Sequence, residues 1–183
     1  MLWIGDGIGA AIVIDGRLHR GFTGGAGEIG YMPVAGQPPV RGISRGVNGG
    51  FQNLAGAPAV LKLARSKGFP GSDAAAALRR AAASGPVGTP LLTEVADRLA
   101  VGLAPLVAVF DPELIVLTGA MLQAGGDPLR ALIETSLYDL VIPRPRLVLS
   151  EVAQDPVLAG AIESALAETK QELFDNTRMS RAL

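Results

Sequence analysis

The chain has 183 residues, of which 49% are hydrophobic and 18% are charged, and its 16 basic and 17 acidic side chains give a formal net charge of -1. This balance leaves no basic stripe to neutralise nucleic-acid phosphates, so we expect this segment alone not to bind DNA. The sequence has no cysteine, which excludes disulfides and thiolate metal sites. The apolar stretch 8–14 is too short to span a bilayer and follows no basic residue, so neither a membrane anchor nor a signal peptide is predicted. One soluble, cytoplasmic domain covering residues 1–183 is therefore expected.

Strands are predicted at the start of the chain. Residues 2–4, 10–14 and 17–20 are predicted as three short strands, and Asp15-Gly16 supplies a tight hairpin turn between the last two. The stretch 32–50 is rich in Gly, Pro and Arg without a regular period, which predicts a long loop. Helices are predicted over 51–67, with an interruption at Pro58, and over 73–84.

The second half of the sequence alternates helices with strands. Three helices are predicted where a capping side chain precedes a proline, at Thr89-Pro90, Asp127-Pro128 and Asp155-Pro156. In the first helix, which Pro105 is expected to bend, the predicted buried stripe consists of Leu92, Val95, Leu99, Leu103, Leu106 and Phe110. The apolar runs 114–118 and 146–149 predict central strands. The expected fold is therefore α/β, a mixed sheet in the order β-β-β-α-β-α-β-α with extra helices inserted after the hairpin.

Two glycine-rich motifs carry the strongest functional signal. Gly5-Asp6-Gly7-Ile8-Gly9 lies between predicted strands, and Ala26-Gly27-Glu28-Ile29-Gly30-Tyr31 follows the hairpin. A glycine-rich turn lets backbone N–H groups approach a phosphate, because glycine has no Cβ and tolerates positive φ. A carboxylate in a glycine-walled turn can accept hydrogen bonds from sugar hydroxyls. Together with Ile14-Asp15-Gly16, these motifs resemble the ROK family of repressors and sugar kinases, up to about residue 160.

The resemblance implies half of a two-lobed protein. ROK proteins are built from two ribonuclease H-like halves of the actin and hexokinase superfamily, and this chain looks like the C-terminal half. The aspartate that acts as general base for sugar phosphorylation is implied to lie upstream of the Gly5 turn, beyond Met1. We therefore expect neither this base nor the winged helix-turn-helix of family repressors within these residues.

The implied nucleotide site is altered. The degenerate phosphate loop comprises Gly5, Asp6, Gly7 and Gly9, where Asp6 replaces the usual threonine and would repel phosphates. Alternatively, Asp6 caps the turn through its own backbone amides. The resemblance also places the adenosine end of a nucleotide at Gly119, after the strand 114–118, although a small residue there equally allows close strand-to-helix packing. We expect no ATP cofactor.

The implied zinc site is also altered. Many ROK proteins hold Zn²⁺ with one histidine and three cysteines, and the matching positions here are Tyr31, Ile43, Arg45 and Gly50. None of these side chains is a plausible zinc ligand, so no bound metal is expected.

The implied sugar contacts are partly kept. Glu28 matches one sugar-binding glutamate of the family, whereas Gln52 replaces the second and is followed by Asn53. Glutamine still donates and accepts hydrogen bonds, so recognition of hydroxyls remains possible. Alternatively, Glu28 only ties its turn to nearby amides.

Three functions are compatible with these residues. The first is a catalytically silent effector-binding and oligomerising half of a ROK-type transcriptional regulator, responsive to a sugar. The second is the C-terminal lobe of an ATP-dependent hexose kinase, similar to a glucokinase, and the third is a truncated domain that serves mainly dimerisation. In each case we expect a homodimer, because a half without its partner lobe exposes an apolar face.

Overall fold

The computed structural model describes residues 1–39, 41–42, 49–152, 158–166 and 169–170. The chain divides into two compact units, Met1–Leu149 and Ser150–Leu183, and each is described by itself. In the second unit residues 158–166 are helical. The predicted start of that helix, Asp155, lies outside the described residues.

The first unit is built on a four-stranded mixed sheet. Its strands are β1 (Leu2–Ile4), β2 (Ile8–Ala10), β5 (Leu114–Thr118) and β6 (Arg146–Leu149), in the spatial order β2-β1-β5-β6. Strand β1 pairs antiparallel with β2 and parallel with β5, and β5 pairs parallel with β6. The predicted mixed sheet is therefore confirmed.

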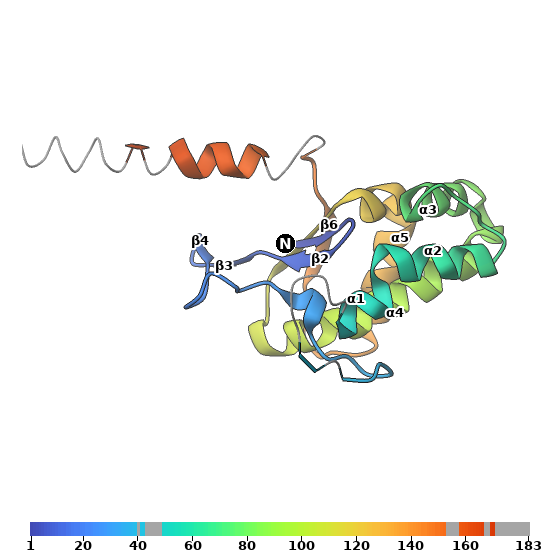
Figure 1. Ribbon diagram of the computed structural model, residues 1–183, viewed down its shortest axis with the longest axis horizontal. Helices are drawn as coiled ribbons and strands as arrows, with labels where there is room; N and C mark the ends of the chain where they lie inside the picture. Colours follow the sequence, from blue (N-terminus) through green and yellow to red (C-terminus); the bar gives the residue numbers. More distant parts are fainter. Residues whose placement is uncertain (40, 43–48, 153–157, 167–168, 171–183) are drawn as a thin grey trace, which may run out of the picture. The chain divides into compact units, whose positions relative to one another are not determined.

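The predicted strand 10–14 is divided in the structure. Strands β3 (Ile12–Ile14) and β4 (Arg17–His19) form a separate antiparallel hairpin, turned at Asp15 and Gly16, which both have positive φ. The break falls at Ala11, whose N–H donates to the carbonyl of Met1 (2.9 Å). Figure 1 shows the hairpin projecting from the sheet on the side away from most of the helical group.

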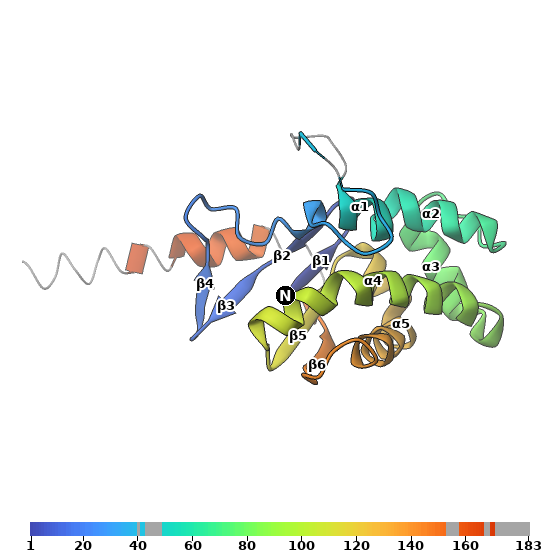
Figure 2. The same ribbon diagram turned by 90° about the horizontal axis from the view of Figure 1, so that it is seen from below.

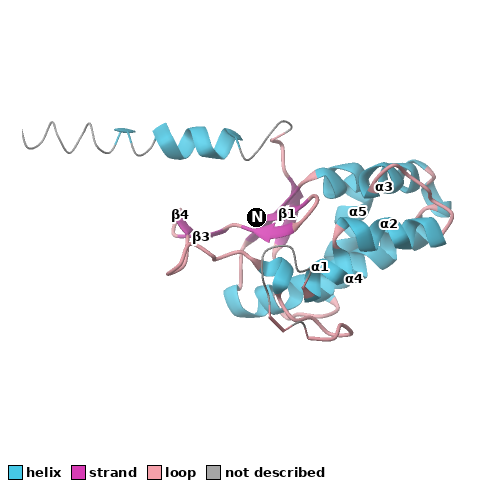
Figure 3. Ribbon diagram, viewed as in Figure 1, coloured by secondary structure: helices cyan, strands magenta, loops and turns pink. Residues whose placement is uncertain are grey.

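Helices are the most abundant regular element of the first unit (Figure 3). They are α1 (Gly50–Ala55), α2 (Ala57–Ser66), α3 (Ala74–Ala83), α4 (Thr89–Phe110) and α5 (Ala120–Tyr138), with short 3-10 turns at Ile29–Tyr31 and Gly85–Val87. The connections β1 to β5 and β5 to β6 step across the sheet in the same direction, and right-handed crossovers then place α4 and α5 on the same face. Accordingly, α5 packs against α4 and α3 (Figures 1 and 2).

The core lies between this sheet face and the helices. It includes Leu2, Ile4 and Leu117 from the strands and Leu99, Ile133 and Leu137 from the helices. The predicted stripe of α4 is buried at Leu92, Val95, Leu99 and Leu103, but Phe110 is 44% exposed. No helix among the described residues is both long and apolar enough to cross a membrane.

Several helix boundaries differ from the prediction. The long helix 51–67 breaks at Gly56 rather than at Pro58, which lies in the first turn of α2, where its missing N–H is harmless. Thr89 is the first residue of α4 rather than its cap, and its hydroxyl donates to the carbonyl of Gly85 (3.3 Å). Helix α5 begins at Ala120 but consists of two helical segments that meet at a kink at Gly126, where φ is 60°, so the predicted start at Asp127-Pro128 coincides with the start of the second segment.

Candidate functional site

The glycine-rich turn connects β1 to β2 at the carboxyl end of β1. Its last paired residues are Ile4 and Ile8, and the N–H of Gly5 donates to the carbonyl of Gly7 (3.1 Å). The indole of Trp3 lies against Gly5, so closely that a Cβ there would be 2.6 Å from the ring. Asp6 is exposed at the tip, and no described residue donates a hydrogen bond to its carboxylate. The capping interpretation of Asp6 therefore has no hydrogen bond to support it within the described residues.

Gln52 joins α1 to this turn. Its Oε1 accepts from the N–H of Ile8 (2.8 Å), and its Nε2 donates to the carbonyl of Asp6 (3.0 Å). Both polar ends of the carboxamide thus bind the backbone of a segment more than 40 residues away. The sequence pattern did not reveal these contacts, because neither partner is a side chain.

The segment carrying Glu28 folds back onto β2. The N–H of Ala10 donates to the carbonyl of Gly27 (2.9 Å), and Gly27 has a φ of 101° that disfavours any other residue. At Gly30 a Cβ would be 2.8 Å from the carbonyl oxygen of Ile8. Glu28 itself is exposed and precedes the 3-10 turn Ile29–Tyr31. Close backbone packing therefore brings the Glu28 segment to the turn that Gln52 binds.

Asn53 faces a different environment. It is exposed on α1 and lines a hollow of about 520 Å³ together with Lys62, Lys67, Glu94 and Arg98. Glu94 bridges the two cations there, at 2.8 Å to Lys67 Nζ and 2.7 Å to Arg98 Nη2. The hydrogen bond from Lys67, followed by that from Arg98, holds the pKa of Glu94 below its ordinary value. The structure thus brings Gln52 against the segment that carries Glu28, at Gly30, whereas Asn53 opens onto the hollow lined by Glu94.

Gly119 lies beside the glycine-rich turn. It follows β5, whose Thr118 is paired with Trp3 of β1, and it has a φ of 99°. A Cβ at this position would come closer than 3.0 Å to the backbone of Ile4, so glycine permits α5 to start directly against β1. The packing interpretation of Gly119 is confirmed by this contact, and its role toward a nucleotide stays a prediction.

The implied zinc loop is closed at its base by backbone contacts. The N–H of Phe51 donates to the carbonyl of Met32 (3.0 Å), and a Cβ at Gly49 would be 2.8 Å from the Cα of Tyr31. Two of the four altered ligand positions, Ile43 and Arg45, lie outside the described residues. The two ends of the loop are therefore held together by main-chain packing.

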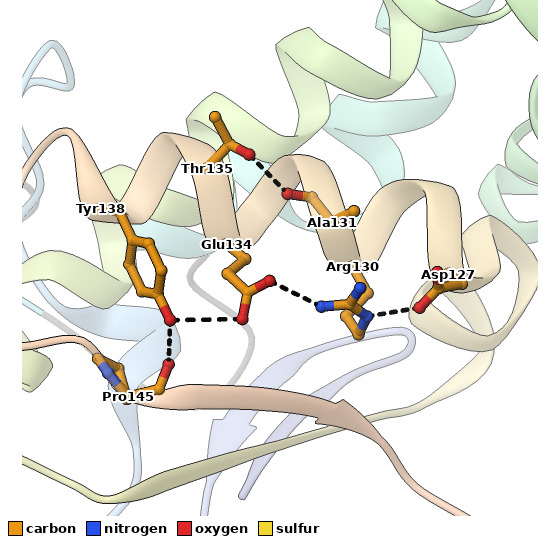
Figure 4. Close-up of polar contacts among 7 residues, drawn as sticks. All are labelled: Asp127, Arg130, Ala131, Glu134, Thr135, Tyr138 and Pro145. Atoms are coloured by element: carbon orange, nitrogen blue, oxygen red, sulfur yellow. Dashed lines mark hydrogen bonds and ion pairs between the residues drawn. The ribbon is translucent and has the colours of Figure 1, made fainter.

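A polar chain along α5 was missed at the sequence level. Arg130 bridges Asp127 (2.5 Å) and Glu134 (2.9 Å), and the hydroxyl of Tyr138 lies 2.8 Å from the carbonyl of Pro145 and 3.3 Å from Glu134 (Figure 4). The Arg130 contact lowers the pKa of Asp127, and burial, followed by the nearby Glu134 carboxylate, raises the pKa of Tyr138. The spacing of three and four residues is the signal that could have revealed this chain.

An apolar hollow of about 580 Å³ lies at the opposite edge of the sheet from the glycine-rich turn. Its lining includes Ile12 and Val13 of the β3–β4 hairpin, Leu106 and Phe110 of α4, and Leu114 of β5. Of these, Val13 is 62% and Leu114 is 40% exposed. This surface has the apolar character expected of an association surface.

Comparisons with known proteins identify the family. Residues 1–169 match the model of the ROK family. The chain is 35% identical over 166 residues to the bifunctional enzyme NanE/NanK of Brucella melitensis, covering 90% of this chain and 30% of that protein. It is 32% identical over 127 residues to a putative xylose repressor of Caldicellulosiruptor sp., covering 62% of this chain and 31% of the repressor.

The fold also matches a solved ROK structure. The ROK hexokinase from Thermus thermophilus superimposes with a TM-score of 0.71 at 27% identity, over 92% of this chain and 57% of the hexokinase. The expected fold of the hexokinase superfamily is thereby confirmed. The chain spans less than two thirds of the length of each of these relatives. It belongs to the ROK family.

Proposed function

We propose that this chain, as a ROK family member, is the effector-binding and oligomerising half of a sugar-responsive transcriptional regulator and does not transfer phosphate. Its ligand would be a sugar recognised through Glu28, Gln52 and Asn53. It would need no ATP or zinc, act in the cytoplasm, and leave DNA binding to another segment. The similar proteins include a putative xylose repressor and a ROK hexokinase, so membership in the family is compatible with either role.

The occupation of the glycine-rich turn by Gln52 carries this proposal. A turn that cradles a phosphate offers its backbone N–H groups to the ligand. Here the N–H of Ile8 already donates to Gln52, and the exposed carboxylate of Asp6 adds a negative charge at the tip. A phosphate would meet one fewer donor and a like charge, and both weaken its binding.

The sugar-facing part keeps its chemistry. Glu28 is exposed and ionisable, and the Gln52 carboxamide retains a second N–H and a second lone pair beyond those that bind the turn. A pyranose presents neighbouring hydroxyls that both donate and accept. Hydroxyl recognition is therefore compatible with the turn as it is folded.

Calorimetric titration and a coupled ADP assay test the proposal together. We expect glucose, xylose or N-acetylmannosamine to bind, Glu28→Gln to weaken that binding at least tenfold, and no variant to produce ADP from ATP and sugar. Glu113→Gln, which changes an exposed glutamate just before β5, at the opposite end of that strand from Gly119, is the matched control and should bind as the wild type does. ADP production above background that Glu28→Gln abolishes would instead support the kinase lobe.

A further inference from the structure

We infer that Gln52 is a positioning residue, whose carboxamide holds the glycine-rich turn and the Glu28 segment in register against α1. The inference deepens the proposed function and rests on it for the role of the site. The positioning role of Gln52, however, is a property of the folded chain without ligand, so it is tested in the absence of sugar.

Two hydrogen bonds define the attachment. One runs from the N–H of Ile8 to Oε1 (2.8 Å) and the other from Nε2 to the carbonyl of Asp6 (3.0 Å). The two backbone groups belong to Asp6 and Ile8, on either side of Gly7, so the carboxamide bridges the turn across Gly7. Each such bond contributes on the order of a fivefold change in a folding equilibrium, and an orphaned partner costs more.

Two glycines on neighbouring segments lie against the carboxamide. A Cβ at Gly30 would be 3.4 Å from Oε1, which is ordinary contact, so the Glu28 segment packs against this oxygen. A Cβ at Gly56 would be 2.7 Å from Nε2, so the break between α1 and α2 leaves space for the nitrogen. Gln52 therefore contacts the turn, the Glu28 segment and the junction of two helices.

Only a carboxamide, or a protonated carboxyl, matches this arrangement. The Ile8 N–H needs an acceptor and the Asp6 carbonyl needs a donor. An ionised carboxylate has no donor and would set its charge against a carbonyl oxygen, whereas the protonated acid restores one donor and one acceptor. The variant Gln52→Glu should therefore form the same two hydrogen bonds only when its carboxyl is protonated.

The charged groups on the segments around Gln52 act in opposite directions on an introduced carboxyl. They are Asp6 on the turn, Glu28 on its segment, and Arg98 of α4, whose guanidinium donates to the carbonyl of Leu54 (3.3 Å), next to its ion pair with Glu94. The two nearby carboxylates disfavour a third negative charge, which raises the pKa of the introduced carboxyl in the folded state. Arg98 and Lys67, just after α2, oppose this shift, and Glu94, which pairs with both, balances one of their two positive charges.

The test measures folding equilibria by urea titration between pH 4.5 and 8 without ligand. At pH 8 we expect Gln52→Glu and Gln52→Leu each to lower the folding equilibrium constant about 10- to 100-fold relative to the wild type. The protonated carboxyl stabilises the fold fully below its unfolded pKa, and this contribution is lost as the pH rises through its raised folded pKa. The deficit of Gln52→Glu should therefore shrink toward pH 4.5, while that of Gln52→Leu stays constant.

Gln37→Glu is the matched control. Among the described residues, the hydrogen bond of Gln37 is the one from its backbone N–H to the carbonyl of Val34 (3.3 Å), so its variant should show no deficit that disappears on acidification. Equal deficits of Gln52→Glu at both ends of the pH range, or a Gln52→Leu variant as stable as the wild type, would overturn the inference.

Amide exchange gives a second measurement that does not depend on how well a variant folds. In the wild type the Ile8 N–H should exchange at least tenfold more slowly than the unbonded N–H groups of exposed loops, and unprotected exchange at Ile8 would overturn the inference. If the pH rescue and the protection hold but no sugar binds, the positioning role stands and the proposed function fails. If sugar binds but acidification does not restore the stability of Gln52→Glu, the proposed function stands and the positioning role fails.

Discussion

The substitution Gly102→Ala tests how tightly α4 packs against the Phe51 ring of α1. Gly102 lies in the middle of α4, and a Cβ on it would come closer than 3.0 Å to three atoms of the Phe51 ring. Phe51 is fully buried, and it immediately precedes Gln52. The contact thus links the core to the candidate site.

The magnitude follows from two opposing effects. Alanine is favoured over glycine in a helix interior by about 1 kcal/mol. Overpacking a buried contact costs about 1–3 kcal/mol, and the upper end applies because a ring cannot yield as a flexible chain end does. We therefore expect Gly102→Ala to lower the free energy of unfolding by about 2 kcal/mol, or the melting temperature by roughly 4–8 °C.

Urea denaturation followed by the fluorescence of Trp3 measures this loss. A double-mutant cycle with Phe51→Leu gives the control, because a smaller side chain leaves room for the new methyl group. We expect Gly102→Ala to cost at least about 1 kcal/mol less in that background. A Gly102→Ala variant as stable as the wild type, or a cycle without coupling, would refute the reasoning.

Four further predictions follow from other contacts. Gly119→Ala should lower the free energy of unfolding by about 3 kcal/mol, because it combines positive-φ strain with a clash against Ile4. Gly68 has a φ of 82° but no neighbour within 4 Å, so Gly68→Ala should lower the free energy of unfolding by only about 1 kcal/mol, as measured by thermal unfolding. Glu94→Gln should lower stability by roughly 0.5–1 kcal/mol at pH 7. Because the pKa of Glu94 is lowered in the folded state, this stability difference should persist at pH values above the ordinary pKa of a glutamate. Urea titrations should show it vanish as the pH falls through the pKa that Glu94 has in the folded state. Elemental analysis after purification without chelator should find no zinc, and about one zinc per chain would contradict the reading of Tyr31 and Gly50 as non-ligands. We expect a homodimer with an interface of at least about 1,200 Å² in total. Light scattering should therefore give twice the chain mass of 18.8 kDa, and the single-chain mass over a wide concentration range would argue against the dimer.

The elements with strong local signals were predicted well. The strands 114–118 and 146–149 agree with β5 and β6, and Asp73 caps α3 by accepting from the N–H of Ala76 (2.8 Å). Apolar run length and capping chemistry act within a few residues, so the sequence displays them directly. The glycine motifs likewise predicted the turn between β1 and β2.

Features fixed by distant backbone could not be predicted. The start of α5 is set by the approach of Gly119 to Ile4, and no side chain caps that end. The interpretation of Gln52 as a sugar contact came from its position in a motif, while its two hydrogen bonds depend on where β1 and β2 lie. Loop 32–50 was predicted as irregular, but the contact of Phe51 with Met32 that closes it needed the fold.

The kink at Gly126 divides α5 into a short arm and a long arm. The short arm, from Ala120, begins at the Gly119 turn beside the candidate site. Within the long arm Arg130 pairs with Asp127 and Glu134, and at its end Tyr138 donates to the carbonyl of Pro145, just before β6. The segment beside the candidate site and the segment attached just before β6 therefore belong to two separate helical arms, joined at a residue without helical geometry.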